Sequence, residues 1–440
     1  MQAQYSKPPA ATRPGLHGPA ERRSVQINLT ILADARATSL HTALRTAPAA
    51  PTTRRAPARS LFPAPLRLAS LAACLVLLAA LTGCGNFFVP VTTTPGGGGG
   101  TTGTGDYVYV ANGSTNTIAG YSITKATGAL TSTPGSPYTV GISPTALAIT
   151  ANNSFLFVGG YGGLYEYSIS STGALTALNG GAALASVLAQ SMTVSPDGQW
   201  LFILNSDAAT LSQFQINQTT GALTQATGTS FSVGGSSQAV KISPNGQYIF
   251  IAMGTGGTLV YGFNTSTGGM SISPLRLVPQ TLISDNALAV DANSAYLYIA
   301  RSGSTGSGVA AYSIASGGAL TSVAGSPTAT GVGPYSILLN STGAYLYVGN
   351  RTDGTISEYS VGSGGVLTAL ASSPVKAVGT LPVAMARDNS GSYIAVANNG
   401  GAPDLNILGI SGSSPGTLAS VATATTGTDP TNPTAIVATH

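Results

Sequence analysis

Short apolar and aromatic runs, each followed by a glycine-rich turn, recur along the chain. The runs include YVYVAN at 107–112, YLYIAR at 296–301 and YLYVGN at 345–350. Their β-branched and aromatic residues favour strands, and no helical period of apolar residues separates them. The pattern predicts an all-β chain built from seven copies of one unit, with runs that start at 107, 155, 200, 248, 296, 345 and 393.

Each unit contains four candidate strands. The first run is followed by a strand such as TIAGYSI at 117–123, by a glycine turn with a short strand such as GALT at 128–131, and by a small apolar strand such as PTALAIT at 144–150. Dipeptides such as Asp197-Gly198 then lead into the next unit, and they tolerate the positive φ that tight hairpins need. Four short antiparallel strands in about 48 residues have the size of a β-propeller blade.

The two ends of the repeat region complement each other. The first unit lacks a small apolar strand before it, whereas the chain ends with PTAIVATH at 433–440, which matches PTALAIT at 144–150. We therefore predict a seven-bladed β-propeller of four-stranded antiparallel blades over 106–440. The C-terminal strand completes the first blade (three strands from one end and one from the other), so that no sheet edge is left open.

The repeats resemble those of a known family. The YVYVAN-like strand, the GALT turn and the SPDG or SPNG hairpin are similar to the YVTN-type repeats of the lactonase family, which includes bacterial 6-phosphogluconolactonase. The resemblance covers residues 106–440 and implies the propeller fold. It also implies a possible lactone-hydrolysing activity, but a fold alone does not determine function.

Polar residues that follow the first strand of each unit, or precede the small apolar strand, are expected to meet at one mouth of the central channel. Arg301 and Arg351 on neighbouring blades are the best anion-binding pair, and lactone hydrolysis would need a base to activate water. The candidate bases are Asp207 and Asp353. The candidate ligand-binding residues are Arg301, Arg351, Asn112, Asn205, Asn350, Asn398, Asp285 and Tyr335. The other polar residues expected at this mouth are Asn116, Asn399 and Asp404 after the first strands, and Tyr138, Gln190, Gln238 and Asn286 before the small apolar strands.

The chain departs from the His/Arg/Glu-type cluster that the resemblance to 6-phosphogluconolactonase implies. His17 and His41 precede the propeller, and His440 is the last residue. Glu166 and Glu358 lie in the second strands of their units, where we expect them to face solvent. A propeller that binds a protein, a glycan or a small molecule is therefore favoured, with a lactone hydrolase that uses Arg and Asp as the alternative. We expect no metal and no cofactor, because the propeller lacks cysteine and internal histidine ligands.

A 16-residue apolar run at 68–83 precedes Cys84. The run is too short for a confident transmembrane helix and has the length of a signal-peptide core. Leu81-Thr82-Gly83-Cys84 resembles the bacterial lipobox. We expect a lipoprotein signal peptide over 67–83, a lipidated Cys84 and a Gly/Thr tether within 84–105. Residues 1–66 are expected to form a disordered extension, which a translation start nearer Leu61 would omit.

The distribution of charge bears on the partners. Residues 1–67 carry ten Lys and Arg and two acidic residues, whereas 106–440 carry seven basic and eleven acidic residues and thus a net charge of −4. A nucleic-acid partner would need a basic patch on the folded part, so none is expected. We expect an exported monomer, anchored by lipid to a membrane, with Gly85 favouring the outer membrane.

Overall fold

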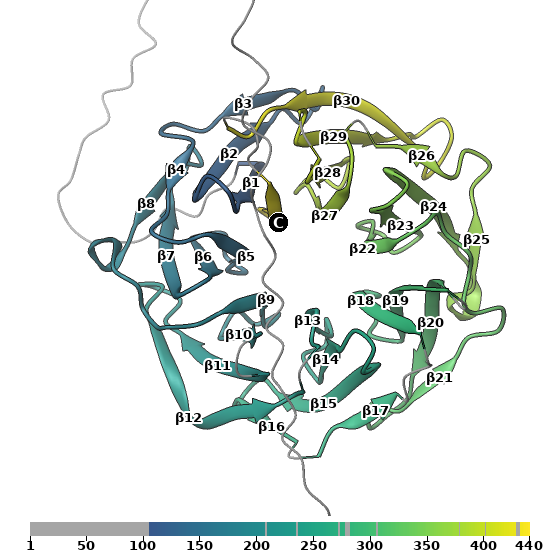
Figure 1. Cartoon of the computed structure of the whole chain (residues 1–440), viewed down its shortest axis with the longest axis horizontal. Coiled ribbons are helices and arrows are strands. Elements are labelled where there is room, and N and C mark those ends of the chain that lie inside the picture. The colour runs from purple at the N-terminus through teal and green to yellow at the C-terminus, as the bar shows by residue number, and fades with distance from the viewer. Residues whose placement is uncertain are drawn as a thin grey trace, which may run out of the picture. The chain divides into compact units, whose positions relative to one another are not determined.

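Seven antiparallel sheets form a closed ring around a central channel (Figure 1). The computed structural model describes residues 105–440 except 207–208, 235, 272, 278–281, 305–306, 378, 401 and 428–431, and except the side chains of 227–229. Two short 3-10 turns, Asn179–Gly181 and Ser363–Gly365, are the helical segments in this part of the chain. The prediction of an all-β, seven-bladed propeller is confirmed.

Each blade runs from an inner strand at the channel to an outer strand at the rim. From inner to outer strand, the first blade consists of β31 (Pro433–Ala438), β1 (Tyr107–Asn112), β2 (Thr117–Ile123) and β3 (Leu130–Ser132), the second of β5 (Pro144–Ile149), β6 (Phe155–Gly160), β7 (Gly163–Ile169) and β8 (Leu175–Ala177), and the third of β9 (Ala189–Val194), β10 (Trp200–Asn205), β11 (Thr210–Ile216) and β12 (Leu223–Ser232). The fourth blade consists of β13 (Ala239–Ile242), β14 (Tyr248–Ala252), β15 (Thr258–Asn264) and β16 (Gly269–Met270), and the fifth of β18 (Ile283–Val290), β19 (Tyr296–Gly303), β20 (Gly308–Ile314) and β21 (Leu320–Ser322). The sixth blade consists of β22 (Pro334–Leu339), β23 (Tyr345–Asn350), β24 (Thr355–Val361) and β25 (Leu367–Ala369), and the seventh of β27 (Pro382–Arg387), β28 (Tyr393–Asn398), β29 (Leu405–Ile410) and β30 (Leu418–Ala424).

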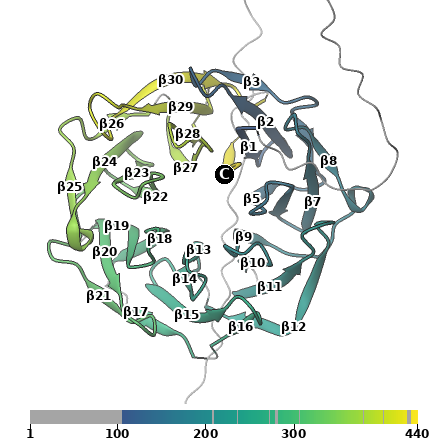
Figure 2. The ribbon, with the colours of Figure 1, turned by 180° about the vertical axis from the view of Figure 1, so that it is seen from behind.

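Three blades carry one more short strand beside their third strand. These extra strands are β4 (Tyr138–Thr139), β17 (Leu275–Leu277) and β26 (Val375–Lys376), which pair with β2, β15 and β24. They lie on the outer part of the ring (Figure 1), and β17 and β26 are seen there from behind in Figure 2. They do not change the order of the strands that line the channel.

Strand β31 closes the ring at its inner edge, as predicted. It pairs antiparallel with β1, with Val108 opposite Ala438 and Val110 opposite Ile436, and the end of the chain lies at the channel (Figure 1). Beyond the strand, the Tyr107 amide donates to Thr439 Oγ1 at 2.9 Å. The first blade therefore combines three strands from one end of the propeller with one from the other.

The core lies between neighbouring blades. The second strand of each blade is sandwiched between two blades, so β1, β6, β10 and β28 are buried along their whole length. In three blades a tyrosine hydroxyl of this strand donates to the carbonyl of a turn glycine in the next blade. The pairs are Tyr109 with Gly173 at 2.8 Å, Tyr298 with Gly365 at 3.3 Å, and Tyr347 with Gly416 at 2.9 Å.

Glu166 and Glu358 are buried between blades, so the expectation that they face solvent is wrong. Their side chains are 4% and 0% exposed, because the third strand of a blade also packs against its neighbour. Glu358 accepts hydrogen bonds from the Leu418 amide at 2.6 Å and from Ser372 Oγ at 2.5 Å. Oε1 of Glu166 has no hydrogen-bond partner, and burial raises the pKa of Glu166 to about 7.

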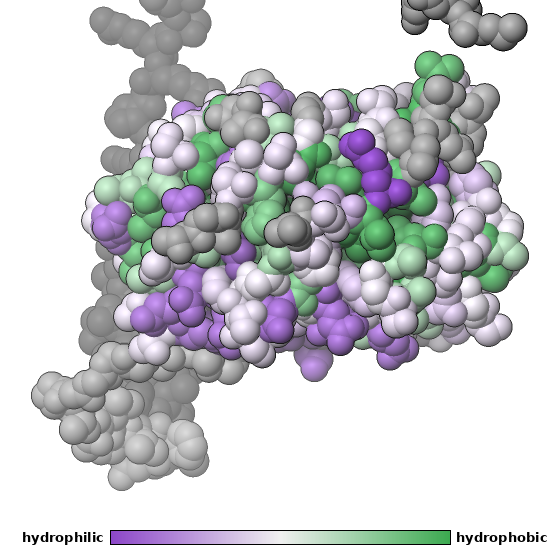
Figure 3. All heavy atoms as spheres, turned by 90° about the horizontal axis from the view of Figure 1, so that it is seen from below, coloured by the Kyte–Doolittle hydropathy of each residue, from purple (hydrophilic) through white to green (hydrophobic). Residues whose placement is uncertain are grey.

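The outer surface carries few charges. Seen from the side, most of the propeller surface is intermediate in hydropathy, and hydrophilic residues gather along one edge of the ring (Figure 3). Among the residues that the structure describes, no helix has the length and apolar character needed to cross a membrane. The predicted signal peptide, Cys84 and the tether before residue 105 lie outside the described residues.

Candidate functional site

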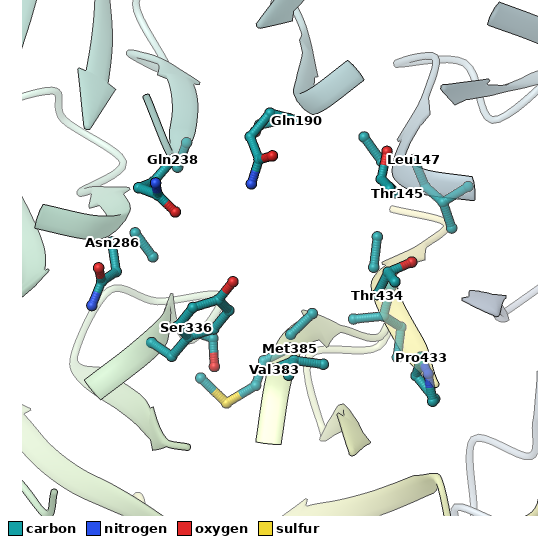
Figure 4. A pocket seen from close by; sticks show the side chains of 18 of the residues that line it. Thr145, Leu147, Gln190, Gln238, Asn286, Ser336, Val383, Met385, Pro433 and Thr434 are labelled. Carbon is teal, nitrogen blue, oxygen red and sulfur yellow. The ribbon is translucent and has the colours of Figure 1, made fainter. Parts of the chain in front are cut away.

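A cavity of about 410 Å³ lies at the mouth of the channel where the inner strands begin. All seven inner strands contribute to its wall, and their side chains converge on one space (Figure 4). The polar lining consists mainly of amides and hydroxyls. The polar residues among those that line it are Thr145, Tyr161, Gln190, Ser191, Gln238, Asn286, Tyr335, Ser336, Arg351, Asn399 and Thr434.

Hydrogen bonds fix several of these amides in place. Asn286 donates from Nδ2 to Ser302 Oγ at 2.9 Å and to the Pro334 carbonyl at 2.8 Å. Asn399 Nδ2 donates to the Pro433 carbonyl at 2.8 Å, and Gln238 Nε2 donates to the Ser236 carbonyl at 3.0 Å. The mouth therefore carries neutral polar groups whose orientation is set by the surrounding backbone, which favours recognition of a polar ligand.

Arg351 is the charged residue of this lining. It follows the last residue of β23, and its guanidinium carbon lies 5.0 Å from the centre of the Tyr335 ring. Its Nε is buried without a hydrogen-bond partner, and the described residues place no carboxylate within ion-pair distance of it. A guanidinium held on an aromatic face with its charge uncompensated is suited to bind an anion.

Arg301 is placed differently from Arg351. Its Nε donates to Asp285 Oδ1 at 2.6 Å and its Nη2 donates to Asp285 Oδ2 at 3.2 Å, and both side chains are buried. The hydroxyl of Thr258 in the preceding blade donates to the same carboxylate at 2.8 Å. Neither Arg301 nor Asp285 lines the cavity, so the structure does not bring the two candidate arginines together.

The four candidate asparagines also lie outside the cavity lining. Each ends the second strand of its blade and is buried. Asn350 donates from Nδ2 to Thr355 Oγ1 at 3.0 Å and to Ser357 Oγ at 2.9 Å, and Asn205 likewise donates to Ser212 Oγ at 2.8 Å. Asn112 donates to the Thr426 carbonyl at 3.0 Å. The main-chain amide of Asn398 donates to the Asp404 carbonyl at 2.7 Å.

The candidate bases are not found in the described lining. Asp353 is exposed, its Oδ2 accepts from the Val332 amide, and it does not line the cavity. Asp207 lies outside the described residues. Among the residues that the structure describes, the cavity wall contains no Asp, Glu or His, and no group of three or more potential metal ligands is found in that part of the chain.

Two threonines that the sequence analysis did not single out lie at the mouth. Thr145 and Thr434 occupy the same place in the matching PTA segments at 144–146 and 433–435. Thr434 donates to the Pro144 carbonyl at 2.8 Å, and Thr145 donates to the Ala189 carbonyl. They tie neighbouring inner strands together around the channel, and the repeat of PTA was the available signal for them.

The channel continues beyond this cavity into a second one. The second cavity, of about 630 Å³, lies at the opposite ends of the inner strands. The two share four apolar residues: Leu147, Met192, Met385 and Ile436. Apolar side chains therefore line the boundary between the amide-rich mouth, which contains Arg351, and the far end of the channel.

The ring, its closure by β31 and its channel-mouth cavity define the chain as a seven-bladed β-propeller. The model of the family described as "Lactonase, 7-bladed beta-propeller" matches residues 159–261 and 326–430. The family resemblance that the repeats carry is confirmed for the propeller.

Solved structures with the same fold include three bacterial proteins. They are a protein from Lactobacillus plantarum (17% identity, TM-score 0.61, covering 76% of this chain and 99% of that chain), a candidate 6-phosphogluconolactonase from Bacteroides fragilis (18%, 0.61, 77% and 99%) and a periplasmic gluconolactonase from Pseudomonas aeruginosa (18%, 0.59, 76% and 99%). At these identities the likeness shows the fold alone. The search of curated protein sequences found no match.

Proposed function

We propose that the chain is a binding propeller that takes a small, polyhydroxylated acid, such as a sugar acid, into the cavity at the start of the inner strands. The observation that carries this proposal is Arg351, a cationic side chain stacked on Tyr335 with no acidic partner among the described residues. The remaining polar lining consists of neutral amides and hydroxyls.

The chemistry of the lining matches such a ligand at two points. A carboxylate of the ligand would bind the guanidinium of Arg351, since charge-assisted hydrogen bonds are the strongest in such sites. Hydroxyl groups of the ligand would exchange hydrogen bonds with amides such as Gln190 and Gln238, which project from β9 and from just before β13 (Figure 4). A neutral sugar of the same size would keep the second set of contacts and lose the first.

Lactone hydrolysis is the second candidate function, and the family match favours it. It needs a group that accepts a proton from the attacking water. The described lining offers Arg351 to stabilise a developing oxyanion and supplies no carboxylate or imidazole as base. Asp207 is the base that this hypothesis requires, and its place is outside the described residues.

Calorimetry on the full chain tests the binding proposal. We expect gluconate to bind at least tenfold more tightly than glucose, and Arg351→Gln to abolish that difference, because the change removes the positive charge at the mouth. Arg276→Gln is the matched control, since Arg276 lies on the outer strand β17 and does not line the cavity. Equal binding of gluconate by the wild-type chain and Arg351→Gln would refute the proposal.

A lactonase assay on the same samples separates the two functions. Hydrolysis of δ-gluconolactone above the rate in buffer, abolished by Asp207→Asn, would establish the enzyme. Turnover equal to the buffer rate, together with gluconate binding that depends on Arg351, would establish the binding propeller.

The place of action that we propose is the cell envelope, with the propeller tethered through a lipid on Cys84. This part of the proposal rests on the apolar run at 68–83 and the Leu81-Thr82-Gly83-Cys84 motif. Metabolic labelling with a fatty-acid analogue should label the wild-type chain, and Cys84→Ser should remain unlabelled and uncleaved. Label on the Cys84→Ser variant would exclude this anchor.

A further inference from the structure

The second cavity of the channel collects positive charge. It lies where the inner strands end, and it is lined by Lys241 of β13, Arg387 at the end of β27, and His440, which follows β31. The three side chains come from three different blades. No Asp or Glu is found among the described residues that line this cavity.

The charges of these groups are not neutralised by the acids nearby. Asp388, next to Arg387, is 1% exposed and accepts from the amides of Tyr393 at 2.7 Å and Ser390 at 3.1 Å. Asp197 accepts from the Gln199 amide at 3.1 Å in its own hairpin turn. Arg387 reaches the Leu339 carbonyl at 3.5 Å, which is a weak contact. The ion pair found among the described residues joins Arg301 to Asp285 and involves neither Lys241 nor Arg387.

The charge of Arg387 acts on the two other groups. Lys241 is exposed within the channel, and desolvation by the surrounding walls, together with the charge of Arg387, lowers the pKa of its ammonium group. Desolvation, and in addition the charges of Arg387 and Lys241, lower the pKa of the His440 imidazole. A bound anion would relieve this repulsion.

The concentration of charge is unusual for this propeller. Residues 106–440 have a net charge of −4 from seven basic and eleven acidic residues, yet two of the seven basic residues and the single histidine of that region line one cavity. Solvated surface charges would be spread over the ring.

We propose that this cavity is a second binding site, specific for a small oxyanion that carries two or more negative charges. The guanidinium of Arg387 would bind two oxygens side by side, and Lys241 would act as a point charge on a third. His440 would join them as a hydrogen-bond donor. A phosphoryl group and a polycarboxylate share this chemistry, and the experiment distinguishes them.

The site is distinct from the amide-rich mouth. Leu147, Met192, Met385 and Ile436 line both cavities where they adjoin, whereas Arg351 lines only the first cavity and Lys241, Arg387 and His440 line only the second. The proposal therefore stands or falls independently of the function proposed for Arg351.

Calorimetry and NMR on the full chain, purified with a histidine-free tag, test the proposal. Pyrophosphate and citrate are the two probes, and acetate is the monovalent control. We expect at least one of the two probes to bind tenfold or more tightly than acetate. We also expect it to raise the pKa of the His440 imidazole, because a bound anion stabilises the imidazolium. The His440→Gln variant assigns the signal of His440 among the three histidines of the chain.

Charge-removing variants decide whether the cavity is responsible. Lys241→Gln and Arg387→Gln should each weaken binding at least tenfold, whereas Lys241→Arg, which keeps the charge, should retain it. Lys376→Gln is the matched control, because Lys376 lies on the outer strand β26 and does not line the cavity. Unaltered circular dichroism shows that each variant is folded.

Two results would overturn the proposal. The first is the absence of pyrophosphate and citrate binding to the wild-type chain at millimolar concentration. The second is binding that Lys241→Gln and Arg387→Gln leave unchanged. A preference for pyrophosphate over citrate identifies a phosphoryl ligand, and the reverse identifies a polycarboxylate.

Discussion

Replacing Glu166 by Gln should stabilise the propeller at neutral and alkaline pH. The Glu166 carboxylate is 4% exposed, and its Oε1 has no hydrogen-bond partner. It lies against the turn of the next blade, since a Cβ added at Gly221 would lie 1.7 Å from Oε1. In that blade pair, Phe157 stands where other blades have a tyrosine, so no phenol hydroxyl reaches the turn.

The third blade shows what the substituted side chain can do. Phe202 occupies the place of Phe157 there, and Gln213 occupies the place of Glu166. Gln213 Nε2 donates to the Gly268 carbonyl at 2.9 Å, which is the carbonyl that a tyrosine binds in other blades. We expect the amide of Glu166→Gln to bind the Gly221 carbonyl in the same way.

The magnitude follows from the pKa of Glu166, which rises from 4.5 to about 7 on folding. Because the folded state holds the proton more tightly than the unfolded state, ionisation opposes folding, and stability is lost as pH rises from 4.5 to 7. At 1.36 kcal/mol for each pKa unit, the loss reaches about 3 kcal/mol above pH 7. Gln cannot ionise, so the gain from the substitution should be near zero at pH 4.5 and about 3 kcal/mol at pH 8.

Denaturant unfolding at pH 5 and pH 8 measures this gain. Trp200, the single tryptophan, is buried in the blade next to Glu166 and reports unfolding by its fluorescence. The reverse substitution, Gln213→Glu, is the matched control and should destabilise the propeller more at pH 8 than at pH 5. A gain from Glu166→Gln that is equal at both pH values would refute the reasoning, because the penalty would then not come from ionisation.

Three further predictions concern stability. Asp285→Asn should cost about 3–5 kcal/mol in denaturant unfolding, because it leaves the buried Arg301 without its partner; a cost below 1 kcal/mol would contradict this role. Asn350→Ala should cost about 1–3 kcal/mol through the loss of its bonds to Thr355 and Ser357, with gluconate binding unchanged in calorimetry. Deletion of 432–440 removes the strand that pairs with β1 and should lower the melting temperature by about 10 °C or more; an unchanged melting temperature would count against closure by β31.

The blades could be predicted well from the sequence because each blade repeats the same order of strands and turns. Seven Tyr-rich strands, seven turns and the match between 144–150 and 433–440 all indicated one closed ring. The orientation of Glu166 and Glu358 was predicted incorrectly, since alternation along a strand assumes one solvent-facing side. In a propeller both faces of a blade pack against neighbours, so a polar residue in the third strand can be buried between two blades.

The candidate site was harder to predict because two neighbouring residues at the end of each Tyr-rich run have different surroundings. The sixth residue of several Tyr-rich runs, such as Asn350 and Arg301, is buried and bonded to neighbouring strands. The seventh residue of three runs lines the channel-mouth cavity, namely Tyr161, Arg351 and Asn399. The sequence analysis treated the sixth and seventh residues alike, as residues that follow the strand, although the sixth residue ends the run and the seventh comes after it.

This one-residue difference in position separates residues that stabilise the fold from residues that can bind a ligand in the repeats of the chain. An asparagine at the sixth position holds the third strand through Ser or Thr side chains, as Asn350 does with Thr355. Where blade five replaces it with Arg301, Asp285 supplies the compensating charge. At the seventh position, Tyr161, Arg351 and Asn399 differ in chemistry and line one cavity. Substitution at the sixth position should therefore change the unfolding free energy, whereas substitution at the seventh should change which ligand binds.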